Sequence, residues 1–301
     1  MNLVRTEKGE YALQASDVKK VAVLGAGLMG SGIAQVCSQA GIDVVMRDIK
    51  DEFLEKGMKG IKDGLGKVVS KGKMTQADAD AIVGRIETTT DLAKAAGEAD
   101  LIIEAIPEDM KLKKEVYKEV SQNASENTMI ASNTSTLSIN EMAASVKHPE
   151  NFLGLHFFNP APVMKLVEVV KGKKTSDETV QFGRDFATRV GKTPVACIDS
   201  PGFIANRVAL PIMIEAVTAL EEGVATKEDI DTAMELGYNH PMGPLKLADL
   251  VGLDTVLHSI KSVGDKIKSP KWKAPKLLEE MVKEGKLGRK TGRGFYEYPQ
   301  K

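Results

Sequence analysis

The sequence predicts an α/β fold in which a mostly parallel sheet, with helices between its strands, is followed by an all-α domain. Three observations support this prediction. Short β-rich runs alternate with helical patterns from residue 20 to about residue 198, as they do in a parallel sheet. A glycine-rich turn directly follows the first of these runs. After Ser200-Pro201-Gly202 the chain shows helical patterns only.

The chain is long enough for two domains. It has 301 residues, of which 42% are hydrophobic and 28% are charged, an ordinary balance for a globular protein with a sizeable core. We place one domain at residues 1–199 and the other at residues 200–301. Residues 1–18 form an extra N-terminal segment of the first domain, and we assign them no function.

The charge balance and the cysteine content exclude several classes of function. Lys and Arg number 41 and Asp and Glu 42, so the net charge of −1 provides no field that attracts nucleic acid or a membrane surface. Two cysteines are too few for a disulfide framework, and neither a secretory signal nor an apolar run of membrane-spanning length is present. We expect a cytoplasmic protein without a nucleic-acid partner, a membrane partner or a bound metal.

Seven β-rich runs make up the expected sheet. Leu101-Ile102-Ile103 is apolar at every position, which is typical of a strand covered by helices on both faces. The expected strands are Val21 to Gly25, Asp43 to Asp48, Asp100 to Ile106, Thr128 to Ser132, Phe152 to Phe158, Lys165 to Val170 and Pro194 to Ile198.

The helical half begins with a long apolar helix over Phe203 to Glu222, which Pro211 should kink. Its apolar residues cover much of the circumference, so it is buried on more than one side. This surface favours a homodimer through the helical domain, and packing within one subunit is the alternative. Further helices are expected over Lys227 to Leu236, Leu245 to Val263 and Ala274 to Glu284.

The glycine-rich turn predicts a dinucleotide site in a Rossmann-type domain. The strand Val21-Ala22-Val23-Leu24 leads into Gly25-Ala26-Gly27-Leu28-Met29-Gly30, and a helical pattern follows at once. Gly25 permits the tight turn, Gly27 lets the backbone approach a pyrophosphate, and Gly30 packs the helix on the strand. Backbone N–H groups at the helix start, those of Leu28 and Met29 included, then bind phosphate.

Asp48 indicates that the dinucleotide is NAD. It ends the second strand, eighteen positions after Gly30, where a carboxylate accepts a hydrogen bond from the ribose 2′-hydroxyl and repels a 2′-phosphate. Arg47 leaves NADP open, because a guanidinium beside the acid can neutralise a phosphate. An exposed strand-end residue is the other interpretation of Arg47.

Polar residues follow three later strands, at the edge where ligands of a parallel sheet gather. Glu108 follows the strand at residue 100, and Asn133-Thr134-Ser135 follows the strand at residue 128, where it could equally cap a helix. His156 ends a third, apolar strand. A histidine there is suited to proton transfer near neutral pH, although a hydrogen-bonded core residue is the plainer interpretation.

The chain resembles the L-3-hydroxyacyl-CoA dehydrogenase family, of the short-chain or 3-hydroxybutyryl-CoA dehydrogenase kind. The resemblance covers about residues 20 to 298. Besides the glycine-rich turn, the matching motifs occur in family order: Ala131-Ser132-Asn133-Thr134-Ser135, Gly154-Leu155-His156-Phe157-Phe158-Asn159-Pro160, Met164-Lys165-Leu166-Val167-Glu168-Val169, Pro201-Gly202-Phe203-Ile204-Ala205-Asn206-Arg207, Gly243-Pro244-Leu245, Asp249, Gly252-Leu253-Asp254 and Lys290-Thr291-Gly292-Arg293-Gly294-Phe295-Tyr296.

The resemblance implies reversible hydride transfer between C3 of a 3-hydroxyacyl-CoA and NAD, a reaction of fatty acid metabolism. His156 is then the general base and acid, and Glu168 holds its imidazole. Ser135 and Asn206 match residues that position the substrate, so both domains contribute to the site. The positions that match cofactor contacts are Glu108, Lys113, Ser135, Asn159 and Lys290. The family also implies a dimer.

The distance between His156 and Glu168 along the chain leaves their contact open. If residues 159–162 formed a simple turn, His156 would pair with Lys165, and Glu168 would lie about 10 Å further along the strand. A direct hydrogen bond therefore needs a bulge, an offset or a longer connection. From its position in the sequence alone, Glu168 is interpreted as an exposed strand residue.

Binding of the CoA moiety is predicted at a lysine-rich helix over Glu52 to Lys71. Such a helix is usually a solvated surface. Lys71 nevertheless matches a family position that contacts CoA. Gly64 stands where the family has a serine that contacts the substrate, which removes one expected contact.

Two other functions account for some of the same residues. One is a dehydrogenase of a small free hydroxy acid, such as gulonate or carnitine, and activity on acetoacetyl-CoA against free acetoacetate separates it. The other is a dinucleotide-binding protein without turnover, which the joint presence of Ser135, His156, Glu168 and Asn206 disfavours. A bifunctional β-oxidation enzyme is excluded by length, since no residues remain for a hydratase domain.

Overall fold

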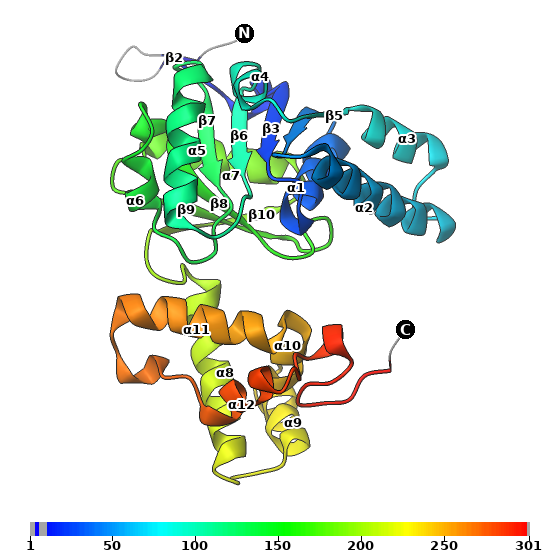
Figure 1. Ribbon diagram of the computed structural model, residues 1–301, viewed down its shortest axis with the longest axis vertical. Coiled ribbons are helices and arrows are strands. Elements are labelled where there is room, and N and C mark those ends of the chain that lie inside the picture. The colour runs from blue at the N-terminus through cyan, green and yellow to red at the C-terminus, as the bar shows by residue number, and fades with distance from the viewer. Residues whose placement is uncertain (1–3, 6–10, 300–301) are drawn as a thin grey trace. The chain divides into compact units, whose positions relative to one another are not determined.

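The computed structural model describes residues 4–5 and 11–299 and divides into two compact units, Met1–Asp199 and Ser200–Lys301 (Figure 1). We describe each unit separately. Across the part of the chain that the structure describes, no helix has both the length and the apolar character needed to cross a membrane.

An eight-stranded sheet forms the centre of the first unit, as the sequence predicts for the fold class. Its strand order is β10-β9-β8-β7-β6-β3-β4-β5, and every neighbouring pair is parallel except β8 with β9. The strands are β3 (Lys20–Leu24), β4 (Asp43–Arg47), β5 (Ile86–Thr89), β6 (Leu101–Glu104), β7 (Met129–Ser132), β8 (Phe152–Phe157), β9 (Leu166–Lys171) and β10 (Thr193–Ile198). A separate antiparallel pair joins β1 (Val4–Arg5) to β2 (Tyr11–Ala12).

Strand β5 was not expected from the sequence. It has four residues, Ile-Glu-Thr-Thr, of which only Ile86 is buried, because the strand lies at the sheet edge. A short polar edge strand carries neither the apolar run nor the alternation by which strands are found. The central strands β6 and β7, in contrast, are buried at every position.

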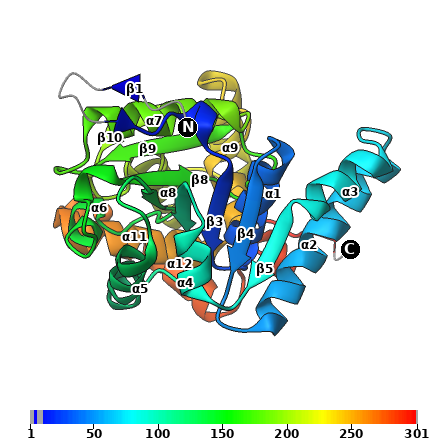
Figure 2. The same cartoon turned by 90° about the horizontal axis from the view of Figure 1, so that it is seen from above.

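Helices cover both faces of this sheet. They are α1 (Leu28–Gln39), α2 (Asp51–Ser70), α3 (Gln76–Gly84), α4 (Leu92–Gly97), α5 (Met110–Asn123), α6 (Ile139–Ala143) and α7 (Asp177–Arg189). On one face, Ile33 of α1 and Phe186 of α7 pack into the core with alternate strand residues. On the other, the ring of Tyr117 in α5 meets Phe152 of β8 edge-on at 5.0 Å. Helices α2 and α3 lie beside the β5 end of the sheet (Figure 2).

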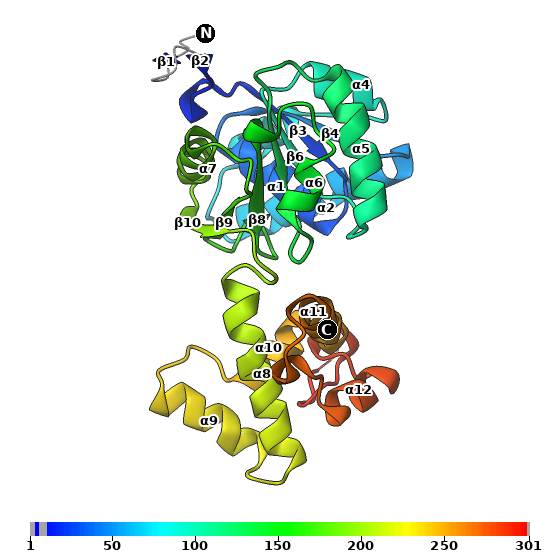
Figure 3. The same ribbon diagram turned by 90° about the vertical axis from the view of Figure 1, so that its left-hand side faces the viewer.

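The second unit consists of helices with their own apolar core. They are α8 (Ala205–Glu221), α9 (Lys227–Gly237), α10 (Pro244–Val251), α11 (Leu253–Ile267) and α12 (Lys276–Lys283). Helix α8 packs beside α9, α10 and α11 (Figure 3). The core centres on Val217, Leu245 and Ile260.

The single helix expected over Leu245 to Val263 was wrong. Gly252 has φ +102°, so α10 ends there and α11 starts anew. The apolar periodicity continues on both sides of this glycine, which concealed the break. A positive φ costs little at glycine and is strained elsewhere.

Two buried aspartates hold the C-terminal segment of the second unit. Asp249 accepts hydrogen bonds from the backbone N–H of Phe295 and Tyr296, both at 2.9 Å. Asp231 accepts from the hydroxyl of Tyr296 at 2.8 Å. A Cβ on Gly294 would lie 1.9 Å from Oδ1 of Asp249, so only glycine fits there. Asp249 and residues 290–296, which belong to the motifs shared with the family, therefore stabilise the fold of the helical unit.

Candidate active site

The glycine-rich turn has the space that a pyrophosphate needs. Gly25 has φ +104°, and a Cβ there would lie 2.6 Å from the carbonyl oxygen of Ala105. A Cβ on Gly30 would lie 1.8 Å from the carbonyl oxygen of Gly25, so helix and turn are in close contact. A Cβ on Gly27 would meet nothing within 4 Å. The open side of Gly27, at the N-terminus of α1, can accept a phosphate, and the residues present fit a dinucleotide.

Asp48 lies against this turn, where the sequence predicts a ribose-binding carboxylate. Its Oδ2 accepts from the N–H of Ala26 and its Oδ1 from the N–H of Ile49, both at 2.7 Å. These bonds fix the carboxylate beside the glycines. Arg47 donates from Nε to the carbonyl oxygen of Thr90 at 3.2 Å, which directs its guanidinium toward the chain after β5.

His156 and Glu168 form a buried pair across the antiparallel strands β8 and β9. They occupy opposite positions in the register, and Nδ1 of His156 lies 2.7 Å from Oε2 of Glu168. Their exposed fractions are 4% and 1%. Of the three arrangements that would permit contact, the structure has the longer connection, residues 158–165. Lys192 closes this connection by donating to the carbonyl oxygens of Ala161 and Met164 at 2.6 and 2.8 Å.

Ser135 meets the other side of the imidazole. Its Oγ lies 3.1 Å from Nε2 of His156. Because a carboxylate only accepts hydrogen bonds, Nδ1 carries a proton, and in the neutral imidazole Nε2 is then the acceptor. The loop after β7 carries Ser135, and we call it the serine loop. Asn133 fixes this loop to β8, since its Oδ1 accepts from the N–H of Phe157 at 2.8 Å. The arrangement can take a proton from a hydroxyl beside Ser135 and return it.

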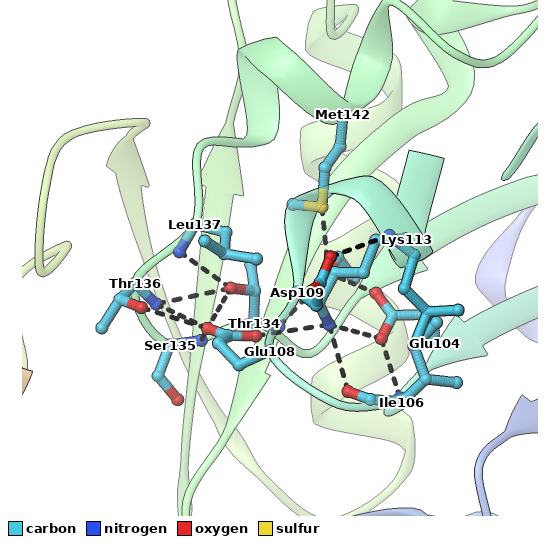
Figure 4. Close-up of polar contacts among 12 residues, drawn as sticks. Glu104, Ile106, Glu108, Asp109, Lys113, Thr134, Ser135, Thr136, Leu137 and Met142 are labelled. Carbon is cyan, nitrogen blue, oxygen red and sulfur yellow. Dashed lines mark hydrogen bonds and ion pairs between the residues drawn. The ribbon is translucent and has the colours of Figure 1, made fainter. Parts of the chain in front are cut away.

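Glu108 holds the loop that carries Ser135 (Figure 4). Its Oε1 accepts from Oγ1 of Thr134 at 2.5 Å and from the N–H groups of Ser135 and Thr136 at 3.0 and 3.1 Å. Burial raises the pKa of Glu108, but Lys113 and these donors outweigh it, so the pKa lies below its ordinary value. Glu108 is therefore ionised at neutral pH.

Glu104 is a site residue that the sequence analysis missed. It is fully buried at the end of β6 and pairs with Lys113, whose Nζ lies 2.5 Å from Oε1 of Glu104. Tyr117 and Ser132 donate to its Oε2 at 2.6 and 2.8 Å. The signal in the sequence is an acid directly after the apolar run Leu101-Ile102-Ile103.

Four predicted site residues lie outside this cluster and stay predictions. Asn159 follows β8, and Lys71 is the C-cap residue that follows α2. Asn206 is the second residue of α8 in the helical unit. Lys290, also in that unit, pairs with both carboxylate oxygens of Asp254 at 2.6 Å.

The fold and the site define an NAD-binding dehydrogenase of the Rossmann type. Residues 20–200 match the NAD binding domain of 3-hydroxyacyl-CoA dehydrogenase, and residues 202–298 match the C-terminal domain of the same family. The chain therefore belongs to the 3-hydroxyacyl-CoA dehydrogenase family, and the resemblance stated from its motifs is confirmed. Its cofactor is NAD.

Relatives at substantial identity cover nearly the whole chain. A probable 3-hydroxybutyryl-CoA dehydrogenase of Deinococcus radiodurans is 47% identical over 279 residues, 93% of this chain and 100% of that protein. The human mitochondrial hydroxyacyl-coenzyme A dehydrogenase is 45% identical over 287 residues, covering 93% of this chain and 91% of that one. The crystal structure of (S)-3-hydroxybutyryl-CoA dehydrogenase from Ralstonia eutropha superposes with a TM-score of 0.89 at 42% identity, covering 94% of this chain and 100% of that one.

Proposed function

We propose that the protein catalyses the reversible oxidation of a short-chain L-3-hydroxyacyl-CoA, such as 3-hydroxybutyryl-CoA, to the 3-ketoacyl-CoA. The observation that carries the proposal is the buried pair of His156 and Glu168, with Ser135 at the opposite ring nitrogen. The names of the relatives supply the substrate class. The pair supplies the acid–base chemistry that this oxidation requires.

His156 acts as the general base and acid. In oxidation, Nε2 takes the proton of the C3 hydroxyl as the C3–O bond becomes a carbonyl, and in reduction it returns that proton. NAD, when bound at the glycine-rich turn, would supply the hydride acceptor for C3 and, in the reverse direction, the hydride donor. Glu168 stabilises the imidazolium that forms and keeps the Nδ1 proton in place, because its carboxylate accepts at 2.7 Å.

Substrate and cofactor contacts complete the proposal. Ser135 binds the C3 oxygen beside Nε2, which its hydroxyl already reaches at 3.1 Å. Gly27 and the start of α1 hold the pyrophosphate, and Asp48 accepts from the ribose. Asn206 contributes a substrate contact from the helical unit and Lys71 a contact to CoA, both by resemblance to the family.

The test of the proposed function compares acetoacetyl-CoA with free acetoacetate, each reduced with NADH. We expect a kcat/KM that is at least about a hundredfold higher for the thioester, since the CoA moiety supplies binding energy away from C3. A chain-length series of 3-ketoacyl-CoA thioesters then defines the acyl preference. Equal or faster reduction of the free acid would favour a dehydrogenase of small hydroxy acids instead.

We also propose a homodimer formed through the helical unit. Ile204 and Val208, at the start of α8, are 39% and 58% exposed, which leaves apolar surface for a partner. Light scattering at micromolar concentration should give twice the 32.5 kDa chain mass. A single monomer peak would contradict the dimer.

A further inference from the structure

A chain of charged side chains runs from β6 to the loop that carries Ser135 (Figure 4). Glu104, Lys113 and Glu108 form it, and we call them the charged triad. Glu104 is fully buried and Lys113 is 1% exposed. Buried charges persist only when they are paired and hydrogen-bonded, so Glu104 and Lys113 have a fixed geometry, whereas the side chain of Glu108 is 29% exposed.

Glu104 anchors the triad. Its Oε1 accepts from Lys113 at 2.5 Å and from the N–H of Ile106 at 2.8 Å. Its Oε2 accepts from Tyr117 and Ser132 at 2.6 and 2.8 Å. Donors on both oxygens prevent the carboxylate from rotating, and Lys113 is held in turn.

Lys113 lies between the two carboxylates of the triad. An ammonium group has three donors. Nζ lies 2.5 Å from Oε1 of Glu104, 3.3 Å from the carbonyl oxygen of Ile106 and 3.3 Å from Oε2 of Glu108. Two hydrogen bonds and one ion pair therefore hold the ammonium group between the two carboxylates.

Glu108 connects Lys113 to the serine loop. One of its oxygens faces Lys113, and the other accepts from Thr134, Ser135 and Thr136. Fixing the N–H groups of residues 135 and 136 fixes the backbone that carries the Ser135 hydroxyl. That hydroxyl lies 3.1 Å from Nε2 of His156.

We propose that Glu108 and Lys113, anchored by Glu104, are positioning residues that set the Ser135 hydroxyl on His156. Resemblance to the family places Glu108 and Lys113 among the cofactor contacts, and the geometry adds the contacts by which Glu108 holds the serine loop. The inference rests on the proposed function, because it concerns the same histidine and serine. Its main consequence is that Glu108 acts through Ser135.

A double-mutant cycle tests this dependence. Glu108→Ala should lower kcat about ten- to hundredfold in the wild-type background and less than about threefold in Ser135→Ala, because a lost serine no longer needs a positioned loop. The rates are compared at saturating NADH, so that a change in cofactor affinity does not enter kcat. Equal losses in both backgrounds would overturn the inference in favour of a role for Glu108 in cofactor contact alone.

A spectroscopic readout separates this inference from the proposed function. The chain has four histidines, so the ring signal of His156 in histidine-labelled protein can be assigned with His156→Gln. Without cofactor, Glu108→Ala should move this signal in the same direction as Ser135→Ala, and the double variant should match Ser135→Ala. An unmoved signal would overturn the inference even if acetoacetyl-CoA is reduced. The signal also reports on positioning if that thioester is not a substrate.

Two further variants control for folding. Asp109→Ala removes the neighbouring carboxylate, which caps α5 by accepting from the N–H of Leu112 at 2.9 Å, and should leave kcat unchanged. Glu108→Gln keeps the side-chain shape but faces an amide toward Lys113. If Glu108→Ala fails to fold, Glu108→Gln enters the same cycle, with the same expected coupling to Ser135→Ala.

Discussion

At the scale of single residues, the site depends on histidine and carboxylate groups that the protein has removed from water. His156 and Glu168 are buried among apolar strand residues, so each would be costly alone and is stable only with its partner. The same holds for Lys113 between Glu104 and Glu108. Neutralising one member of such a set leaves a buried charge without compensation.

His156→Gln should lower kcat for acetoacetyl-CoA reduction by about 10²- to 10⁴-fold, the usual loss when a general acid or base is removed. The dissociation constant of NADH should stay within about threefold of the wild type. The matched control is His148→Gln, because His148 is an exposed histidine that pairs with Glu150. Undiminished kcat in His156→Gln would refute the mechanism.

The pKa of Glu108 predicts a contribution to stability at the acidic end of the pH range. Its folded-state pKa lies below 4.5, the ordinary value, so the unfolded chain binds the proton more readily. The contribution is complete above pH 4.5 and is lost as the pH falls through the lower folded-state pKa. Thermal unfolding of wild type and Glu108→Gln should therefore converge below pH 4.5, and a constant difference there would contradict the assignment.

At the scale of elements, glycines allow some helices to lie close to neighbouring backbone and leave space beside others. At the start of α1, Gly30 lies against the carbonyl group of Gly25, whereas Gly27 faces open space. In α2, Gly57 packs on Ala26, a Cβ on Gly64 would meet only Oε1 of Gln35 at 3.9 Å, and a Cβ on Gly60 would meet nothing. Substitutions at these positions thus separate effects on folding from effects on binding.

Gly27→Ala should bind NADH at least about tenfold more weakly and keep its melting temperature, because the added methyl group occupies only the space intended for the pyrophosphate. Gly30→Ala should instead be unstable, since its Cβ would overlap the carbonyl of Gly25. Fluorescence titration and thermal unfolding measure the two effects. Unchanged NADH affinity in Gly27→Ala would place the pyrophosphate elsewhere.

Gly64→Ser should lower the KM for acyl-CoA, because it restores the hydroxyl that the family has at this position and the structure has room for it. It should also raise stability by about 0.5 kcal/mol through helix propensity. Gly60→Ser in the same helix is the control, with a similar gain in stability and an unchanged KM. If both variants change KM alike, position 64 has no special role.

The sequence predicted most elements, and the failures have physical causes. Apolar runs such as Leu101-Ile102-Ile103 identify buried strands, but edge strand β5 has only Ile86 to mark it. Periodicity cannot detect Gly252, whose positive φ divides α10 from α11. The contact of His156 with Glu168 depends on the path of residues 158–165, which local patterns do not determine. The role of Glu104 depends on three donors from two other elements, α5 and β7.

At the scale of the whole molecule, each unit has its own core and its own buried polar network. The triad and the histidine pair belong to the sheet unit, and Asp231 and Asp249 belong to the helical unit. The helical network binds the last described segment through Phe295 and Tyr296. The order of this segment, and of Lys290 before it, therefore depends on carboxylates of the helical unit itself.

Gly294→Ala should destabilise the protein by about 2 to 4 kcal/mol, because its Cβ would displace the carboxylate of Asp249 from two backbone donors. Gly237→Ala is the control, since a Cβ there meets nothing within 4 Å. Denaturant unfolding measures both variants. Equal stability of the two would show that the C-terminal segment can rearrange at little cost.

The reversed direction of β9 has a consequence for how this chemistry can be gained or lost. In a wholly parallel sheet, a base and its partner acid at one edge come from strands separated by a crossover helix. Here they are twelve positions apart in a single hairpin. One short, contiguous segment can therefore be exchanged, grafted or deleted together with the entire acid–base pair, while the dinucleotide turn, far earlier in the chain, stays intact.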